Sequence, residues 1–374
     1  MFSNLKKVIA NIPGWYTNRK IIVFESDDWG SIRMSSNQTR ETLIRQNVIS
    51  AKNVSHFDRY DSLESNDDLE ALFEVLSSVK DHKGNHPIFT AINVVANPAF
   101  EKIKDNNFTK YFYEPFTETL IRYPKHDKVF ILWKEGYEQK LFSPQFHGRE
   151  HLNVTAWMKA LQEGKPKTQL AFEHGITGID SIAIGESKVG YQAAFDIGLT
   201  NELKYLKTVI QEGTELFRQL MGYQASYFVP TNGPFNLSLE ESLYNAGIKF
   251  ITLEKIQKEP LGEGKYKTHL RWLGKKNKFG ITALSRNASF EPSSGGKNWL
   301  NSCLKDIEIA FKWRKPAIIS THRVNYVGFL DESNRKQNLL LLGQLFNKIK
   351  KTWPEVEFMT SVELGDIITQ NNQY

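Results

Sequence analysis

The chain has 374 residues, of which 40% are hydrophobic and 24% are charged. These values are typical of a globular protein and exclude a disordered or fibrous chain. The net charge of +6 is spread along the sequence, and the single cysteine, Cys303, excludes an intramolecular disulfide.

The basic residues do not indicate a nucleic-acid interface. Their densest cluster, Lys275, Lys276 and Lys278, is short and flanked by glycine, which predicts a solvated hairpin turn. Mild basicity is also compatible with an anionic sugar substrate or a membrane surface. No run approaches the roughly 18 apolar residues of a membrane span. The residues before Pro13 lack the apolar stretch of a signal peptide, so we expect a cytoplasmic protein without a membrane span.

Strand and helix patterns alternate along the chain. The first strand, residues 20–24, is apolar on both faces and ends in the polar sequence ESDDWG. Further strands are predicted at 87–98, 128–142 (a strand followed by a loop or short helix), 225–230, 248–254, 269–287 (two strands and a turn), 316–322 and 356–360. Helices are predicted from Asp67, Leu152, Asn201, Ser238, Asn298 and Gln337 onward, and after residue 360. This alternation predicts a parallel β/α barrel, whose polar strand ends would lie at one face.

Two histidines in the sequence HGREH are candidate metal ligands. On a helical turn, positions four apart project from one face, so His147 and His151 could reach one ion. The alternative is a pair of surface histidines that share this spacing by chance.

The Asp27–Asp28 pair directly follows the first strand. Adjacent side chains on an extended strand point in opposite directions, so one carboxylate could bind a metal while the other faces the substrate. The alternative is an acidic turn or helix cap. Taken with the two histidines, the pair predicts a three-ligand site that leaves room for water, and a second carboxylate that accepts a proton from it.

His322 ends another apolar strand and should lie on the same face of the barrel. A histidine there could protonate a leaving amine, or it could simply anchor a loop.

In this order, these residues resemble the motifs of the polysaccharide deacetylase superfamily. The resemblance covers residues 20 to about 365 and implies a distorted (β/α)7 barrel. It also implies that Asp27 is the catalytic base and His322 the catalytic acid. Asp28, His147 and His151 would then hold a divalent metal, with Zn²⁺ expected.

The sequence departs from that family pattern in three places. FVPTNGPF, residues 228–235, lacks the arginine that usually precedes the proline and orients the base, and Arg286 could replace it. Ser320 stands where the last motif usually has an apolar residue. The long interval between Asp28 and His147 predicts an insertion at approximately 35–130 that caps the active-site face of a single barrel domain, 1–374.

The resemblance implies removal of an N-acetyl or other acyl group from a carbohydrate, in surface polysaccharide metabolism. Five residues are candidate substrate contacts: Trp29, Thr231, Asn232, Tyr326 and His174. Two alternatives remain at this stage. One is a barrel glycoside hydrolase that uses carboxylates such as Glu25 or Glu173. The other is a carbohydrate-binding or assembly protein on a degenerate barrel.

Overall fold

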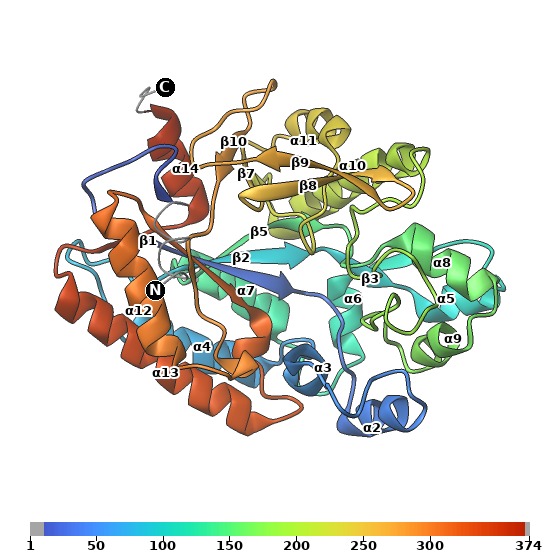
Figure 1. The fold of residues 1–374 in the computed structure, drawn as a ribbon. Coiled ribbons are helices and arrows are strands. Elements are labelled where there is room, and N and C mark those ends of the chain that lie inside the picture. Colours follow the sequence, from blue (N-terminus) through green and yellow to red (C-terminus); the bar gives the residue numbers. More distant parts are fainter. Residues whose placement is uncertain (1–10, 371–374) are drawn as a thin grey trace.

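A curled parallel sheet forms the centre of the protein in the computed structural model, which describes residues 11–370 (Figure 1). In spatial order its strands are β10 (Thr282–Leu284), β7 (Phe250–Thr252), β6 (Tyr227–Phe228), β5 (Phe142–Gly148), β2 (Phe89–Val94), β1 (Ile21–Trp29), β12 (Ala317–His322) and β11 (Ala288–Ser289). A further short strand, β13 (Glu357–Phe358), pairs with the start of β1.

The two strands at the ends of this order are neighbours in the chain. Residues 285–287 alone separate β10, which pairs with β7, from β11, which pairs with β12. The two segments therefore act as one interrupted strand that joins the sheet's edges, and all these pairings are parallel. Counted in this way the sheet has seven strand positions, which confirms the predicted distorted (β/α)7 barrel.

Helices cover the outside of the barrel, as an all-parallel sheet requires. The covering helices are α4 (Asn66–Ser77), α7 (Val129–Glu138), α10 (Glu202–Met221), α11 (Glu240–Asn245), α12 (Trp299–Lys312) and α13 (Glu332–Thr352). Helix α14 (Ser361–Gln370) instead packs on residues that face the inside of the barrel, because Leu364 and Ile368 cluster with Ile21 and Val23. Cys303 is fully buried on α12, as its amphipathic pattern predicts. No helix among residues 11–370 is long and apolar enough to cross a membrane.

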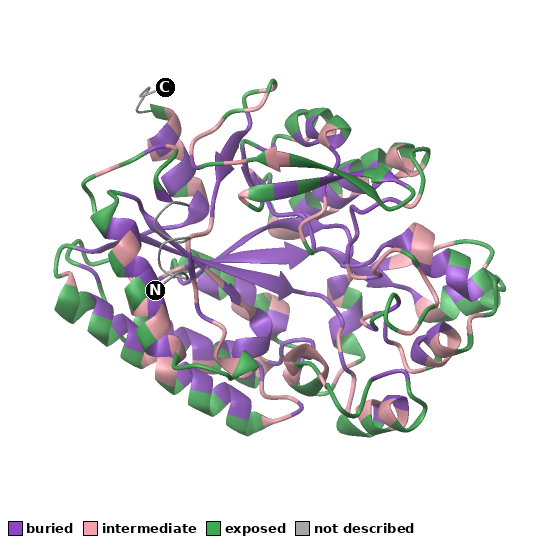
Figure 2. Cartoon of the chain, in the orientation of Figure 1, coloured by how far each residue is buried: buried purple, intermediate pink, exposed green. Residues whose placement is uncertain are grey.

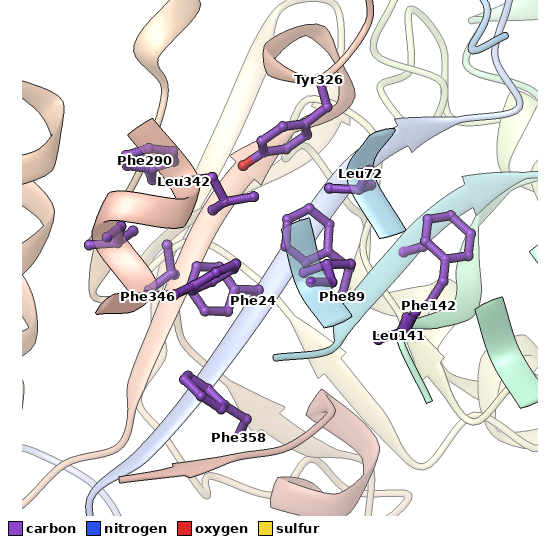
Figure 3. Packing of buried hydrophobic residues seen from close by; sticks show 14 of the residues in the cluster. Phe24, Leu72, Phe89, Leu141, Phe142, Phe290, Tyr326, Leu342, Phe346 and Phe358 are labelled. Carbon is purple, nitrogen blue, oxygen red and sulfur yellow. The ribbon is translucent and has the colours of Figure 1, made fainter. Parts of the chain in front are cut away.

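Aromatic residues fill much of the space between β1, β2, β5 and the helices outside them (Figure 3). The Phe24 ring stacks on Phe89 at a centroid distance of 5.7 Å and meets the edge of Phe346 on α13 at 5.3 Å. All nine residues of β1 are buried. Burying one such large apolar side chain contributes roughly 1.5–3 kcal/mol, so the strand that carries Asp27 and Asp28 is firmly fixed.

Two small antiparallel sheets lie outside the barrel. One joins β3 (Ala96–Pro98) to β4 (Tyr113–Pro115), and the other is the hairpin β8 (Ile256–Gly262) and β9 (Lys265–Leu270). The hairpin is largely exposed (Figure 2). The remaining helices are α2 (Asn37–Arg45), α3 (His56–Tyr60), α5 (Phe100–Asp105), α6 (Phe116–Ile121), α8 (Val154–Gln162) and α9 (Pro166–Glu173).

One predicted strand is wrong. Residues 129–138 form α7, and the strand begins only at Phe142. The apolar run VFILW is compatible with either structure, because a short run does not reveal its period. In the fold, α7 buries one face, which consists of Val129, Trp133 and Gly136 at helical spacing. This burial favours the helix over a strand.

The predicted insertion at 35–130 contains β2 and α4, which belong to the barrel wall. Its other helices include α3, which contacts the turn after β12 and so lies at the carboxyl end of that strand. The division into one barrel domain and a cap stays a prediction. Most of the segment before Pro13, on which the expected cytoplasmic location rests, lies outside the described residues.

Candidate metal and catalytic centre

The end of β1 contains a bulge that separates the two aspartates. Ser26 pairs with Ala91 and Trp29 with Asn93, so two residues of β1, Asp27 and Asp28, oppose one residue of β2. Asp28 has a φ of 78°, an uncommon backbone conformation for a residue other than glycine. The bulge directs Asp27 toward β12 and Asp28 toward His147 in β5 and His151 in the loop after it.

Asp28, His147 and His151 form a group whose potential ligand atoms all lie within 4.8 Å of one another. Asp28 Oδ1 is 3.6 Å from His147 Nε2 and 3.1 Å from His151 Nε2. The expected helical turn is absent: His147 lies in β5, and His151 lies in the loop before α8. The end of a strand and the loop after it bring the two rings together instead.

The protonation of these groups fits a divalent metal. Burial lowers the pKa of His151 to about 4, so its imidazole is neutral at neutral pH. Burial would raise the pKa of Asp28, but the charges and hydrogen bonds of its neighbours lower it well below its usual value. His147 Nδ1 bonds the Val229 carbonyl at 2.7 Å, an orienting contact common for metal-binding histidines. Two nitrogens and one oxygen are ligands that Zn²⁺ accepts in catalytic sites.

Arg286 lies in the interruption between β10 and β11 and holds Asp27, the other aspartate of the pair. Its Nη1 and Nη2 donate to the two oxygens of Asp27, both at 2.6 Å, and its Nε donates to Glu25 at 2.6 Å. Burial would raise the pKa of Asp27, but the charge and hydrogen bonds of Arg286 lower it overall. Asp27 is therefore an ionised, oriented carboxylate at neutral pH. The predicted contact between Arg286 and the base is present.

His322 lies beside Asp27 at the end of β12. Its Nε2 is 3.7 Å from Asp27 Oδ2, and its Nδ1 bonds Glu291 Oε1 at 2.6 Å. Burial would lower the pKa of His322, but Glu291 and the aspartates raise it to about 10. Sequence reasoning gave Glu291 no role. The available signal was its position two residues after β11, at the same face as the other strand ends.

These groups line one cavity of about 400 Å³, within the roughly 300–1,000 Å³ usual for small-molecule sites. Besides Asp27, Asp28, His147, His151, Arg286 and His322, its walls are Val229, Pro230, Asn232, Gly233, Thr252, Leu253, Glu254, Lys255 and Ser285. Asn232 is thus at the cavity, as predicted. Its neighbour Thr231 is fully buried, and its hydroxyl accepts a hydrogen bond from the Ala194 N–H, so Thr231 supports this loop.

Three predicted substrate contacts lie elsewhere. Trp29 and Tyr326 are buried in the aromatic core, where Trp29 packs on Phe142 and Tyr326 on Phe89, so neither ring has a surface for a sugar. Large aromatic rings at such positions are more often part of the core than substrate contacts, and both rings follow this rule. His174 caps the end of α9 and is not among the residues that line the cavity.

The two carboxylates of the glycosidase alternative do not face each other. Glu25 is fully buried beneath the cavity, where it accepts hydrogen bonds from Tyr227, Ser361 and Arg286. Glu173 is exposed at the end of α9 and lines a different hollow. Cleavage of a glycosidic bond by this pair needs one carboxylate on each side of the bond, which this placement does not provide.

No protein-family model matches the sequence, and no curated protein matches it. Solved structures similar to this chain include proteins from Mycobacterium smegmatis and Pseudomonas aeruginosa PAO1 that are named polysaccharide deacetylases. The first is 8% identical over 97% of this chain and 94% of its own, with a TM-score of 0.46. The second is 9% identical over 96% and 93%, with a TM-score of 0.45.

Another similar structure is the 4-alpha-glucanotransferase of Thermococcus litoralis, which is 11% identical over 95% of this chain, with a TM-score of 0.44. The chain spans 41% of the length of that enzyme. Likenesses this distant assign no activity to the protein.

Proposed function

We propose that the protein is a metal-dependent hydrolase that removes an N-acetyl group from an amino sugar. The observation that carries this proposal is the joint position of Asp27, His322 and the three ligands in one cavity. One ionised carboxylate and one protonated imidazole lie 3.7 Å apart there, each held by its own partner. Such a pair has the protonation states that hydrolysis of an amide requires of its base and acid.

A divalent ion held by Asp28, His147 and His151 would supply Lewis acidity toward the acyl carbonyl and lower the pKa of water. Asp27 accepts a proton from the attacking water, whose oxygen forms the new bond to the carbonyl carbon. His322 Nε2 donates its proton to the sugar nitrogen as the C–N bond breaks. The products are a free amine and acetate, and Arg286 and Glu291 keep the two proton carriers in place.

The sugar and the biological setting are the less direct parts of the proposal. The motif resemblance favours a carbohydrate, and the cavity has the volume for one sugar unit. We place the reaction in surface polysaccharide metabolism, on a cytoplasmic precursor.

Metal content and acetate release test the proposal together. The wild-type protein should bind about one divalent ion and release acetate from acetylated amino sugars. His147→Ala should lose the ion, and Asp27→Asn should keep it but lose roughly 10²–10⁴-fold in kcat. The matched control is His86→Ala, because His86 bonds the Val79 carbonyl and does not line the cavity. Wild-type protein without metal would contradict the proposal. A new reducing end without acetate would indicate a glycosidase, and sugar binding without turnover a binding protein.

A further inference from the structure

The cavity has a second polar region away from the metal ligands. Lys255 follows β7 by three residues, and Ser285 follows β10 directly. Both line the catalytic cavity, and both also line a small hollow behind it together with Lys315. Lys255 and Ser285 thus form the wall between the substrate space and the hollow that Lys315 lines.

Ser285 provides a buried hydroxyl that the protein itself does not use. Its side chain is 5% exposed, and its Oγ has no hydrogen-bond partner within residues 11–370. Most buried polar atoms are hydrogen-bonded, so an unpaired hydroxyl in a cavity wall needs an explanation. The oxygen is covered in the observed side-chain conformation, and a rotation about the Ser285 Cα–Cβ bond would present it to an oxygen of a bound ligand.

Two ammonium groups stand at the same place. Burial lowers the pKa of Lys255 to about 8. Lys315 is 4% exposed and donates to the Gly14 and Trp15 carbonyls, and burial together with the charge of Lys255 lowers its pKa to about 8. Two cations that are desolvated side by side disfavour each other, and an anion bound against Lys255 would offset this cost.

The segment around Lys255 carries most of the protein's net positive charge. Residues 254–278, which include the β8–β9 hairpin, contain eight lysines and arginines and three glutamates, a net +5 out of +6 for the chain. This segment begins at the cavity wall and extends into solvent (Figures 1 and 2). A positive field at the mouth of a cleft attracts anionic ligands. Glu254 opposes it locally, but its side chain is exposed whereas Lys255 is half-buried.

We propose that the substrate carries an acidic substituent, a carboxylate or a phosphate, that binds Lys255 and Ser285 while its acyl group lies at the metal site. This inference rests on the proposed function and specifies its substrate class. Ser285 adjoins Arg286, which holds the catalytic base, so one substrate can reach both regions of the cavity.

Acetate release from three matched N-acetylated hexosamines tests this inference: a neutral sugar, the corresponding uronic acid and the corresponding phosphate ester. The wild-type kcat/KM should be higher for one or both acids than for the neutral sugar. Lys255→Gln should lower this acid-to-neutral ratio about tenfold to a hundredfold, the value of a hydrogen bond to a charged group. Lys255→Arg should retain most of the ratio, and Ser285→Ala should lower it less than Lys255→Gln.

Lys258→Gln is the matched control, since Lys258 is exposed on β8 and does not line the cavity. An equal wild-type kcat/KM for neutral and acidic sugars, or an unchanged ratio in Lys255→Gln, would overturn the inference and leave the proposed function intact. If no sugar releases acetate, the proposed function fails first. Calorimetric binding of the same acids then decides: weaker binding to Lys255→Gln than to wild type supports the acidic subsite, and equal binding refutes it.

Discussion

Two departures from the family pattern become one feature at the residue level. Arg286 binds Asp27 from another strand end, and its Nη1 also donates to the hydroxyl of Ser320 at 3.1 Å. An apolar residue at position 320 would remove this acceptor. The serine in the last motif and the arginine outside the third motif therefore complement each other, and Asp27 is oriented by an arginine from a different strand end.

Arg286→Lys should lower kcat about a hundredfold while the metal content stays at the wild-type level. Lysine keeps the charge but cannot form two parallel hydrogen bonds to Asp27, and a small misplacement of a catalytic group costs about this factor. Steady-state kinetics with metal analysis measures both quantities. Arg218→Lys, on the exposed face of α10, is the control. A wild-type kcat in Arg286→Lys would show that Asp27 does not need this orientation.

Glu291→Gln should shift the basic limb of the pH–rate profile to lower pH. His322 must be protonated to donate, so activity falls as the pH rises through its pKa, which is about 10 in the free protein. Without the charge of Glu291 this pKa moves back toward the ordinary 6.5. The free energy of unfolding depends on pH in the same direction. The raised pKa of His322 stabilises the fold fully below pH 6.5, and this contribution disappears as the pH approaches 10. The exposed Glu355→Gln should leave the profile unchanged, and an unshifted limb in Glu291→Gln would rule out His322 as the acid.

At the level of elements, the sequence predicted most strands of the barrel and its longer helices, but not β5 and not the local geometry of the strand ends. Helices α10 and α12 have clear periods and lie where expected, and β1 begins where expected but continues to Trp29 instead of ending at Phe24. The bulge at Asp27–Asp28 has no sequence signature that separates it from an ordinary acidic turn. The helical interpretation correctly predicted that His147 and His151 lie together, but for a wrong reason, because four residues also span a strand end and the following loop.

Gly30→Ala should test how tightly this bulge is fixed. Gly30 has a φ of 76°, and an added Cβ would lie 2.9 Å from the Val94 carbonyl oxygen. Gly84 has a φ of 88° with open space around the same position, so Gly84→Ala reports the backbone conformation alone. We expect Gly84→Ala to cost about 1 kcal/mol, and Gly30→Ala to cost a further 1–3 kcal/mol or so from the close contact. Urea unfolding measures both, and equal losses would mean that the bulge can yield.

At the scale of the whole molecule, long-range ion pairs tie the segment after β1 to the segment after β12. Arg323 is fully buried, and its guanidinium bonds Asp61 at 3.2 Å and Glu64 at 2.9 Å. Arg33 pairs with Asp61 at 3.1 Å and with the candidate metal ligand Asp28 at 3.4 Å. These partners are up to 262 residues apart in the chain. Only the folded barrel brings these partners together, and no local sequence pattern indicates that they meet. This network could therefore not be predicted.

Arg323→Met should therefore destabilise the protein by roughly 3–5 kcal/mol at pH 7, since it leaves buried carboxylates without their main partner. Burial already raises the pKa of Asp61 and Glu64 despite Arg323, and its removal would raise both further. Carboxyl groups with raised pKa values destabilise the fold as the pH rises through them, so the deficit should shrink between pH 7 and pH 5. Urea unfolding at both values measures this, with the exposed Arg218→Met as the control. A deficit that grows on acidification would show that Asp61 and Glu64 remain ionised without Arg323, and that the pairing around Arg33 suffices to hold the two segments together.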